Sequence, residues 1–320
     1  MKRHAAVRIL RIVPVALMVV LLNFLLIHLA PGDPVHILAG DAATPEYVAQ
    51  VRAEFGLDRP VLVQLGIYLS KVLHGDLGTS FLHRRSVLWL IGERIGPTLV
   101  LMATALVLSV VAGVGLGLLA ARRPNSWLDH TARVTALAGF SFPVFWLGQM
   151  LLLVFALWLG WLPAQGMESL REPLSGVAHV LDRLRHLLLP AVTFALFNVA
   201  LLSRLTRTTM VELLQEDFIR TARGKGVGEG RILLTHAFRN ALLPIVTVIG
   251  TNAGLLLMGS VLTETVFGWP GLGRLMYEAL YGRDHPVLMG VFLFVSVAVV
   301  LANLVTDLVY ARLDPRIRLA

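Results

Sequence analysis

The chain contains no cysteine among its 320 residues, which excludes a disulfide framework, a thiol nucleophile and a thiolate metal site. Charged residues are also scarce, because they make up 15% of the sequence, against about 25% in ordinary globular proteins. Hydrophobic residues make up 56%, which is more apolar surface than a fold in water can hide. This composition predicts an integral membrane protein.

Familiar catalytic and nucleotide-binding motifs are missing as well. The sequence has no HExxH, no GxSxG and no GxxxxGK[ST], and its 10 histidines do not cluster at metal-ligand spacing. We therefore predict that the chain is not an enzyme, has no catalytic, cofactor-binding or metal-binding residue, and does not hydrolyse ATP itself. The run GVGLGLLAA at 113–121 matches part of a glycine-rich nucleotide fingerprint, but within a lipid-embedded helix it predicts close approach by another helix.

Acidic residues are missing from the interior of the apolar segments, where they would mark a proton or ion relay. The one candidate, Asp307, lies at the end of a segment near Arg312. Polar side chains inside the segments are neutral, and the best candidates for lining a polar path are Asn198, Thr251 and Asn252. If the chain moves a solute uphill, the energy must come from another polypeptide.

What the sequence does contain is six apolar runs long enough to cross a bilayer, which needs roughly 20 residues each. The predicted fold class is therefore an all-α integral membrane protein with six transmembrane helices. The expected spans are 9–30, 97–121, 131–159, 187–206, 242–263 and 287–310. The first span is expected to be a retained anchor, because its apolar core is longer than that of a signal peptide and no small-residue cleavage site follows it.

The basic residues predict which segments face the cytoplasm. With both termini inside, the inner segments carry 17 lysines and arginines against 7 acidic residues, whereas the outer segments carry 11 against 13. This distribution obeys the positive-inside rule, so both termini and the segment 204–241 are predicted to be cytoplasmic. The net charge of +8 does not indicate nucleic-acid binding, because the basic residues are dispersed and lack interleaved aromatic residues.

The outer segment 31–96 is predicted to contain two short amphipathic helices. TPEYVAQVRAEFG begins with Thr44 as an N-cap and ends at Gly56, and RPVLVQLGIYLSKVLHG runs from Pro60 to Gly75. Two roles stay open for these helices: a lid that packs against the spans, or a landing surface for an extracytoplasmic partner.

The inner segment EDFIRTARGKGVGEGRILLTHAFRN (216–240) is basic and punctuated by glycines. EDFIRTAR is expected to form two helical turns with an apolar stripe of Phe218, Ile219 and Ala222. GKGVGEG is expected to turn the chain, and helix then resumes from Arg231. A helix of this kind at the membrane surface suits docking into a protein groove and resting on lipid headgroups equally well.

Four stretches of the sequence resemble the permease subunits of binding-protein-dependent ABC importers, in the dipeptide, oligopeptide and nickel branch. They are LAPGDP (29–34), FGLDRPVLVQLGIYLSKVLHGDLGTSF (55–81), EDFIRTARGKGV with HAFRNALLPIVT (216–247), and ETVFGWPGLGRL (264–275) with LDPRIR (313–318). The resemblance implies a type I ABC importer permease fold in three parts. These are an N-terminal helix with an extracytoplasmic segment (1–96), a permease core (97–310) that contains a cytoplasmic coupling loop (207–240), and a cytoplasmic tail (311–320).

In this family the inner loop holds a coupling helix that sits in a cleft of a cytoplasmic ATPase. The resemblance implies that the coupling residues here are Arg220, Thr221, Ala222, Arg223, Lys225 and Gly226. Ala222 is expected to allow close approach, and Gly226 is expected to turn the chain. The implied partners are a second, similar permease, two cytoplasmic ATPase subunits or domains that bind ATP and Mg, an extracytoplasmic solute-binding protein, and the lipid of a bacterial or archaeal plasma membrane.

The coupling loop departs from the branch at two positions. Gly224 stands where alanine is usual, and Gly228 stands where a capping serine is usual. Each glycine is expected to loosen the loop, by about 0.8–1 kcal/mol in a helix interior and by a few tenths at an N-cap. The coupling helix is still expected to form, because partner contacts outweigh propensity.

The stretch FGWPGLGRL is expected at the outer mouth, where Phe267 and Trp269 are the candidate residues. Trp269 is expected to be an interfacial anchor, with a contact to the binding protein or an outer gate as the alternative. For the cargo, the branch implies short peptides, with nickel or a metal chelate as the alternative. An ion-driven secondary transporter, an intramembrane enzyme and a membrane scaffold are the rival classes of function.

Overall fold

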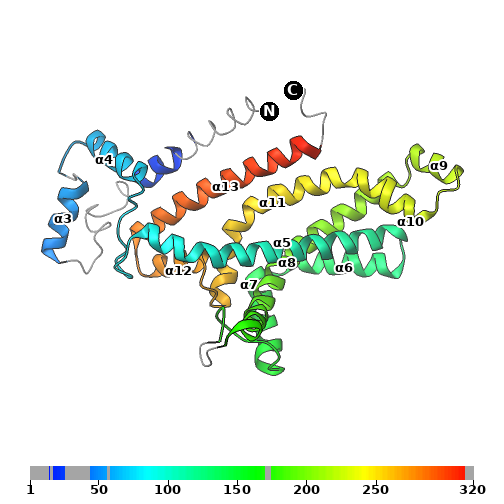
Figure 1. The fold of residues 1–320 in the computed structure, drawn as a ribbon, viewed down its shortest axis with the longest axis horizontal. Coiled ribbons are helices and arrows are strands. Elements are labelled where there is room, and N and C mark those ends of the chain that lie inside the picture. Colours follow the sequence, from blue (N-terminus) through cyan, green and yellow to red (C-terminus); the bar gives the residue numbers. More distant parts are fainter. Residues whose placement is uncertain (1–13, 15–16, 26–43, 56–57, 170–173, 314–320) are drawn as a thin grey trace. The chain divides into compact units, whose positions relative to one another are not determined.

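The structure, a computed structural model, describes residues 14, 17–25, 44–55, 58–169 and 174–313, and every regular element in these ranges is a helix (Figure 1). The predicted all-α class is therefore confirmed for this part of the chain. In chain order the helices are α3 (Pro45–Phe55), α4 (Val61–Leu73), α5 (Val87–Arg122), α6 (Trp127–Ser141), α7 (Val144–Leu151), η1 (Leu152–Trp158), α8 (Gly176–Leu213), α9 (Asp217–Gly224), α10 (Glu229–Arg231), η2 (Ile232–Ala237), α11 (Phe238–Val266), α12 (Leu272–Tyr281) and α13 (His285–Leu313).

Four helices of the described chain are long and apolar enough to cross a membrane. They belong to α5, α8, the stretch from α10 into α11, and α13. The expected spans 97–121, 187–206, 242–263 and 287–310 lie within α5, α8, α11 and α13. The first expected span, 9–30, lies mostly outside the described residues, and its described part at 17–25 is helical.

The expected span 131–159 is divided into two helices beside Pro143. α6 ends at Ser141, Phe142 is extended with φ −99° and ψ 136°, and α7 starts after Pro143. Proline disfavours helical geometry in the residue before it and has no N–H to donate. The apolar run is therefore divided into α6 and a shorter helix made of α7 and the π-helical η1.

The two expected helices of the outer segment are present. The Thr44 hydroxyl accepts a hydrogen bond from the Tyr47 N–H at 3.3 Å, which confirms the predicted N-cap of α3. α4 begins after Pro60, and Gly75, just past its end, has a φ of +77°, a conformation that glycine adopts without strain.

The chain divides into two compact units, 1–98 with 270–304 and 99–269 with 305–320. In the first unit, the start of α5 packs with α12 and the start of α13 around buried Val87, Leu275 and Val291. Asp284 is wholly buried just before α13, and its carboxylate accepts hydrogen bonds from the Ser80 hydroxyl at 2.6 Å and from the Leu82 N–H at 3.2 Å. The loop before α5 is thus fixed to the start of α13.

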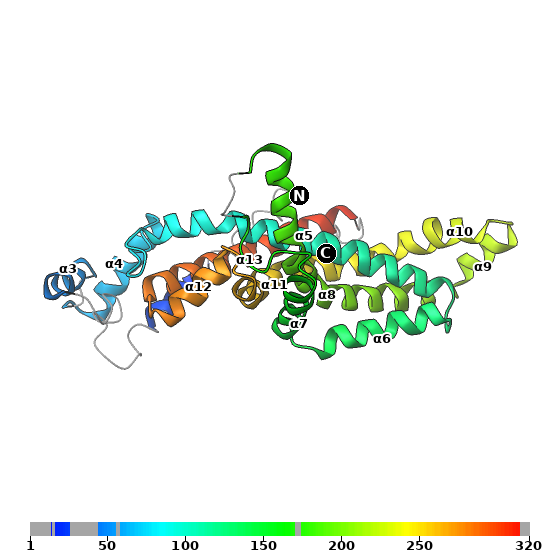
Figure 2. The ribbon, with the colours of Figure 1, turned by 90° about the horizontal axis from the view of Figure 1, so that it is seen from below.

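In the second unit, α8 is the central helix, and α6, α7 and α11 pack against it (Figures 1 and 2). α5 approaches α8 closely at two glycines. A methyl group at Gly113 would lie 2.8 Å from Leu202 Cβ, and one at Gly117 would lie 2.5 Å from Thr206 Cβ. The prediction that the run at 113–121 allows another helix to approach closely is confirmed.

Candidate functional site

The predicted coupling helix is α9, which the short connection 214–216 joins to the end of α8. Asp217 lies in its first turn and Arg223 in its last turn, so both charges complement the helix dipole. Figures 1 and 2 show α9 and α10 at the same end of the second unit as the start of α6. The expected two turns of helix over EDFIRTAR are therefore confirmed.

The end of α9 has the hydrogen bonds of a Schellman motif. Gly226 has a φ of +75°, and its N–H donates to the Arg223 carbonyl at 2.9 Å. The Val227 N–H donates to the Ala222 carbonyl at 3.2 Å, and the Val227 side chain packs on the adjacent buried cluster. Gly226 therefore turns the chain, as the sequence predicts, because few other residues accept this backbone conformation.

One face of α9 is buried within this chain. Ile219 is 0% exposed and Ala222 is 8% exposed. Both belong to a buried cluster with Met210 of α8, Ala121 of α5 and Ile232 of η2. The close approach that Ala222 allows is therefore made to helices of this chain, and its methyl group does not lie on the free surface of α9.

The opposite side of α9 is exposed. Phe218, Thr221 and Lys225 follow helical spacing along it, and Phe218 has 41% of its surface exposed. Arg220 is also exposed and forms an ion pair with Asp217 at 3.2 Å. Of the predicted apolar stripe, Ile219 and Ala222 face this chain, and Phe218 remains on the surface.

Arg223 connects α9 to α10 through a bidentate ion pair with Glu229. Its Nε donates to Oε1 at 2.7 Å, and its Nη2 donates to Oε2 at 3.2 Å. The hydrogen bond and the charge of Arg223 lower the pKa of the Glu229 carboxyl below its usual value. Arg223 was a predicted coupling residue, whereas its partner Glu229 was not identified from the sequence.

The two unusual glycines of the loop lie in open space. A methyl group added at Gly224 or Gly228 would have no neighbour within 4 Å. Gly228 is the N-cap of α10 and provides no side chain to accept a hydrogen bond from the first N–H groups. The helix then continues through the π-helical η2 into α11.

The path candidates lie on two helices of the second unit that pack together, α8 and α11. Asn198 of α8 is buried, with 8% of its surface exposed, and Asn252 of α11 is half-buried. The side chain of Thr251 lies outside the described part of the structure. The assignment of these three residues to a path stays a prediction.

The outer-mouth candidates are core residues. Trp269 is 1% exposed and packs in a buried cluster with Leu101, Leu187 and Ala191, and Phe267 is 2% exposed. The prediction that Trp269 is an interfacial anchor is therefore wrong, because an anchor must present its ring to the headgroup region. No local pattern in the sequence indicated that these two aromatic residues are buried.

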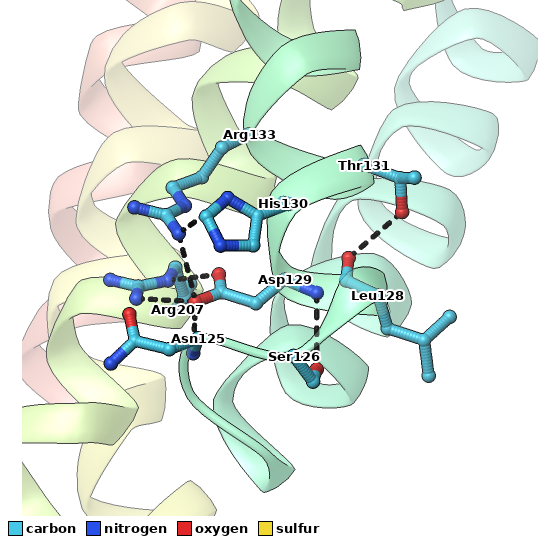
Figure 3. A network of polar contacts seen from close by, with 8 residues as sticks. All are labelled: Asn125, Ser126, Leu128, Asp129, His130, Thr131, Arg133 and Arg207. Atoms are coloured by element: carbon cyan, nitrogen blue, oxygen red, sulfur yellow. Dashed lines mark hydrogen bonds and ion pairs between the residues drawn. The ribbon is translucent and has the colours of Figure 1, made fainter.

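A buried polar network at the start of α6 was not identified from the sequence (Figure 3). Asp129 is 0% exposed. Arg207 of α8 donates two hydrogen bonds to its carboxylate, from Nε to Oδ1 at 2.6 Å and from Nη2 to Oδ2 at 2.8 Å. The hydrogen bond from Arg207 is the main reason why the pKa of Asp129 falls to about 2. The spacing of Ser126 and Asp129 is that of a capping box, which is the one sequence signal for this site.

Comparisons with known proteins agree with this arrangement. Residues 113–319 match the family described as binding-protein-dependent transport system inner membrane component, and residues 1–102 match the N-terminal family of the same transport-system membrane components. The dipeptide transport system permease protein DppB of Alkalihalophilus pseudofirmus is 38% identical over 99% of this chain and 100% of its own length. The glutathione transport system permease protein GsiC of Salmonella choleraesuis is 41% identical over 99% of both chains.

A solved structure has the same fold. A chain of the MetNI methionine ABC transporter, in an inward-facing conformation, matches with a TM-score of 0.58 and 18% sequence identity. The match covers 71% of this chain and 97% of the other. The chain therefore has, over the aligned 71% of its length, the fold of a type I ABC importer permease.

Proposed function

Because the chain belongs to the family of inner-membrane components of binding-protein-dependent transport systems, we propose that it is the permease subunit of an ATP-driven importer of short peptides. The names of two relatives that align over nearly the whole chain support the peptide cargo. Nickel or a metal chelate is the alternative cargo from the same branch. An extracytoplasmic binding protein delivers the cargo and sets most of the specificity.

In this proposal, α9 docks into a groove of a cytoplasmic ATPase. The observation that carries it is the two-sided character of α9. Ile219 and Ala222 anchor the helix on the ends of α8, α5 and η2, while Phe218, Thr221 and Lys225 remain exposed. A short helix with one face fixed and the other free suits groove recognition, and it transmits the displacement of its partner to the helices below it.

The remaining parts of the complex follow from this assignment. ATP and Mg bind to two ATPase subunits or domains, and a second, similar permease completes the path. The proposal includes the expected topology of six spans with both termini in the cytoplasm, in which α9 would lie on the ATPase side of the membrane. Alternating access then arises from rocking of helix groups in the two permeases as the ATPases close and open.

The test uses the complete complex in liposomes, with binding protein and labelled dialanine on one side and ATP on the other. The double variant Arg220→Glu/Thr221→Glu reverses charge on the exposed face of α9. We expect ATP-driven uptake to fall by at least about tenfold, in line with the effect of like-charge contacts at an interface. Gln215→Glu, which adds one negative charge just before α9, is the control and is expected to retain uptake.

Two results would contradict the proposal. If uptake is unchanged in the double variant, α9 does not couple the ATPase to transport. Uptake that persists without any ATPase but stops when the proton gradient is dissipated indicates an ion-driven secondary transporter. Uptake of a nickel chelate in place of dialanine retains the importer and changes only its cargo.

A further inference from the structure

The start of α6 is held by an unusually complete set of contacts around one carboxylate (Figure 3). Asp129 accepts two hydrogen bonds from Arg207, at 2.6 and 2.8 Å, and one from the Asn125 N–H at 2.9 Å. Arg133, one turn further along α6, lies 3.5 Å from the same carboxylate. The carboxylate is fully buried, and the Arg207 side chain is 21% exposed.

This pair, which we call the α6–α8 ion pair, connects residues 78 positions apart in the sequence. Arg133 differs from Arg207 because it belongs to α6 itself and cannot connect the two helices. Burying two charges is unfavourable, and apolar residues of similar size often stabilise a fold equally well. A bidentate pair also requires a specific geometry. Its two hydrogen bonds form only when both helices keep one rotation about their axes and one position along them.

The other contacts of α8 at this level differ in kind. α5 meets α8 through close backbone packing, in which Gly117 faces the Ser203 carbonyl and the Thr206 side chain. α6 packs on α8 at Gly139, where a methyl group would lie 3.1 Å from Ala200 Cβ. Gly139 lies near the far end of α6, so the ion pair holds the opposite end, beside the connection to α5.

The position of Arg207 links this pair to the candidate coupling helix. Arg207 lies one turn before Met210, which is 0% exposed and shares a buried cluster with Ile219 and Ala222 of α9. At its other end, α6 leads through Pro143 into α7, where Gly148 packs against Phe267 and Thr193. α6 therefore connects the region of α9 with the interior of the second unit.

We propose that the α6–α8 ion pair is a positioning device that makes α6 move together with α8 and the coupling helix. The inference rests on the proposed function, because it assumes that an ATPase displaces α9. Asp129 and Arg207 act through helix position and touch neither cargo nor nucleotide. Without the pair, α8 and α9 move while α6 and the segment beyond Pro143 follow incompletely, so ATP is hydrolysed with less transport.

The test compares Asp129→Asn and Arg207→Lys with the matched control Arg133→Gln in the complete complex. Asp129→Asn removes the charge on α6, Arg207→Lys keeps a cation but loses the bidentate geometry, and Arg133→Gln removes a cation that does not connect the helices. ATP hydrolysis and dialanine uptake are measured in the same liposomes. We expect uptake per ATP to fall by roughly tenfold in Asp129→Asn, by less in Arg207→Lys, and to remain unchanged in Arg133→Gln.

A second measurement does not depend on the cargo. Because the chain has no cysteine, spin labels can be placed specifically at Trp127→Cys on α6 and Gln215→Cys beside α9. In the complex with otherwise unchanged sequence, the distance between the labels is expected to be the same with and without ATP. In the Asp129→Asn background, it is expected to change when ATP binds.

The outcomes separate this inference from the proposed function. Uptake per ATP that is unchanged in Asp129→Asn overturns the inference and leaves the importer assignment in place. Hydrolysis and uptake that fall together, with a constant label distance, also overturn it, because the pair then serves only stability or assembly. If the unaltered complex shows no ATP-driven uptake and no response to ATP, the proposed function fails and the inference fails with it.

Discussion

At the scale of single residues, Gly113 and Gly117 show how small side chains determine the distance between helices. Both glycines lie on one face of α5, one turn apart, and both face α8 at less than ordinary van der Waals distance from an added methyl group. Gly115 lies between them in the sequence but on another side of the helix, where an added methyl group meets nothing within 4 Å. The same residue type is therefore essential at two positions and replaceable at the third.

We predict that Gly117→Ala destabilises the chain by about 1–3 kcal/mol, because the new methyl group would lie 2.7 Å from the Ser203 carbonyl oxygen. Gly115→Ala is the matched control, with an expected change within about 0.5 kcal/mol. The midpoint of thermal unfolding in detergent measures both. Equal midpoints for the two variants would mean that α5 and α8 do not pack in this way.

A second prediction concerns the pH dependence of stability at Asp129. The folded-state pKa of about 2 lies below the ordinary aspartate value of 3.8, so the carboxylate stabilises the fold above the unfolded-state pKa and loses this effect as pH falls through the folded-state pKa. The loss between pH 4 and pH 2 is about 2 kcal/mol. Asp129→Asn is expected to remove this part of the acid sensitivity. The measurement is the difference in unfolding free energy between the unaltered protein and the variant at each pH.

At the scale of secondary-structure elements, α9 combines two functions that belong to different faces. Its buried face decides whether the helix stays on the permease, and its exposed face is available to a partner. Substitutions on the two faces are therefore expected to have separable effects.

Ile219→Ala is expected to destabilise the loop by about 2–5 kcal/mol, because a fully buried side chain leaves a cavity. Phe218→Ala is expected to leave thermal stability nearly unchanged and to weaken binding of the ATPase. Stability is followed by thermal unfolding, and binding is followed by co-purification of the ATPase. If both variants still co-purify with the ATPase, α9 is not the coupling site.

The glycines at the end of α9 give another prediction at this scale. Gly226→Ala forces a side chain into a left-handed backbone conformation, at a cost of roughly 1–2 kcal/mol. Gly224→Ala lies in helical conformation and open space, so it is expected to stabilise α9 by up to about 0.8–1 kcal/mol. Amide hydrogen exchange of residues 217–224 is expected to accelerate in the first variant and to slow in the second.

The sequence predicted elements better than it predicted their interruptions and contacts. Hydrophobic length located α5, α8, α11 and α13, and capping residues located α3 and α4. The hydrophobicity of 131–159 could not show that this span divides at Phe142 and Pro143, because a kinked span and a divided span have the same hydrophobicity profile. The burial of Trp269 and the pairing of Asp129 with Arg207 depend on how distant segments pack, which local sequence patterns do not encode.

At the scale of the whole molecule, the absence of cysteine makes the sidedness of the chain directly testable. We predict that Trp127→Cys, at a position that is 80% exposed, reacts with a membrane-impermeant maleimide only from the cytoplasmic side. Val177→Cys, at a position that is 86% exposed, is expected to react only from the opposite side. Labelling of intact cells and of inverted vesicles distinguishes the two sides of the membrane. If both cysteines react from the same side, the predicted topology is contradicted.

α8 has a property that matters beyond its contacts. Its 38 residues correspond to about 57 Å of helix, almost twice the hydrocarbon thickness of roughly 30 Å. α8 is one helix that is interrupted only at Pro190, where a backbone hydrogen bond is lost, and its C-terminal end lies at the short connection before α9. Under the proposed function, a tilt or rotation of this one helix would transmit the effects of cargo binding and of ATP hydrolysis between the two sides of the membrane.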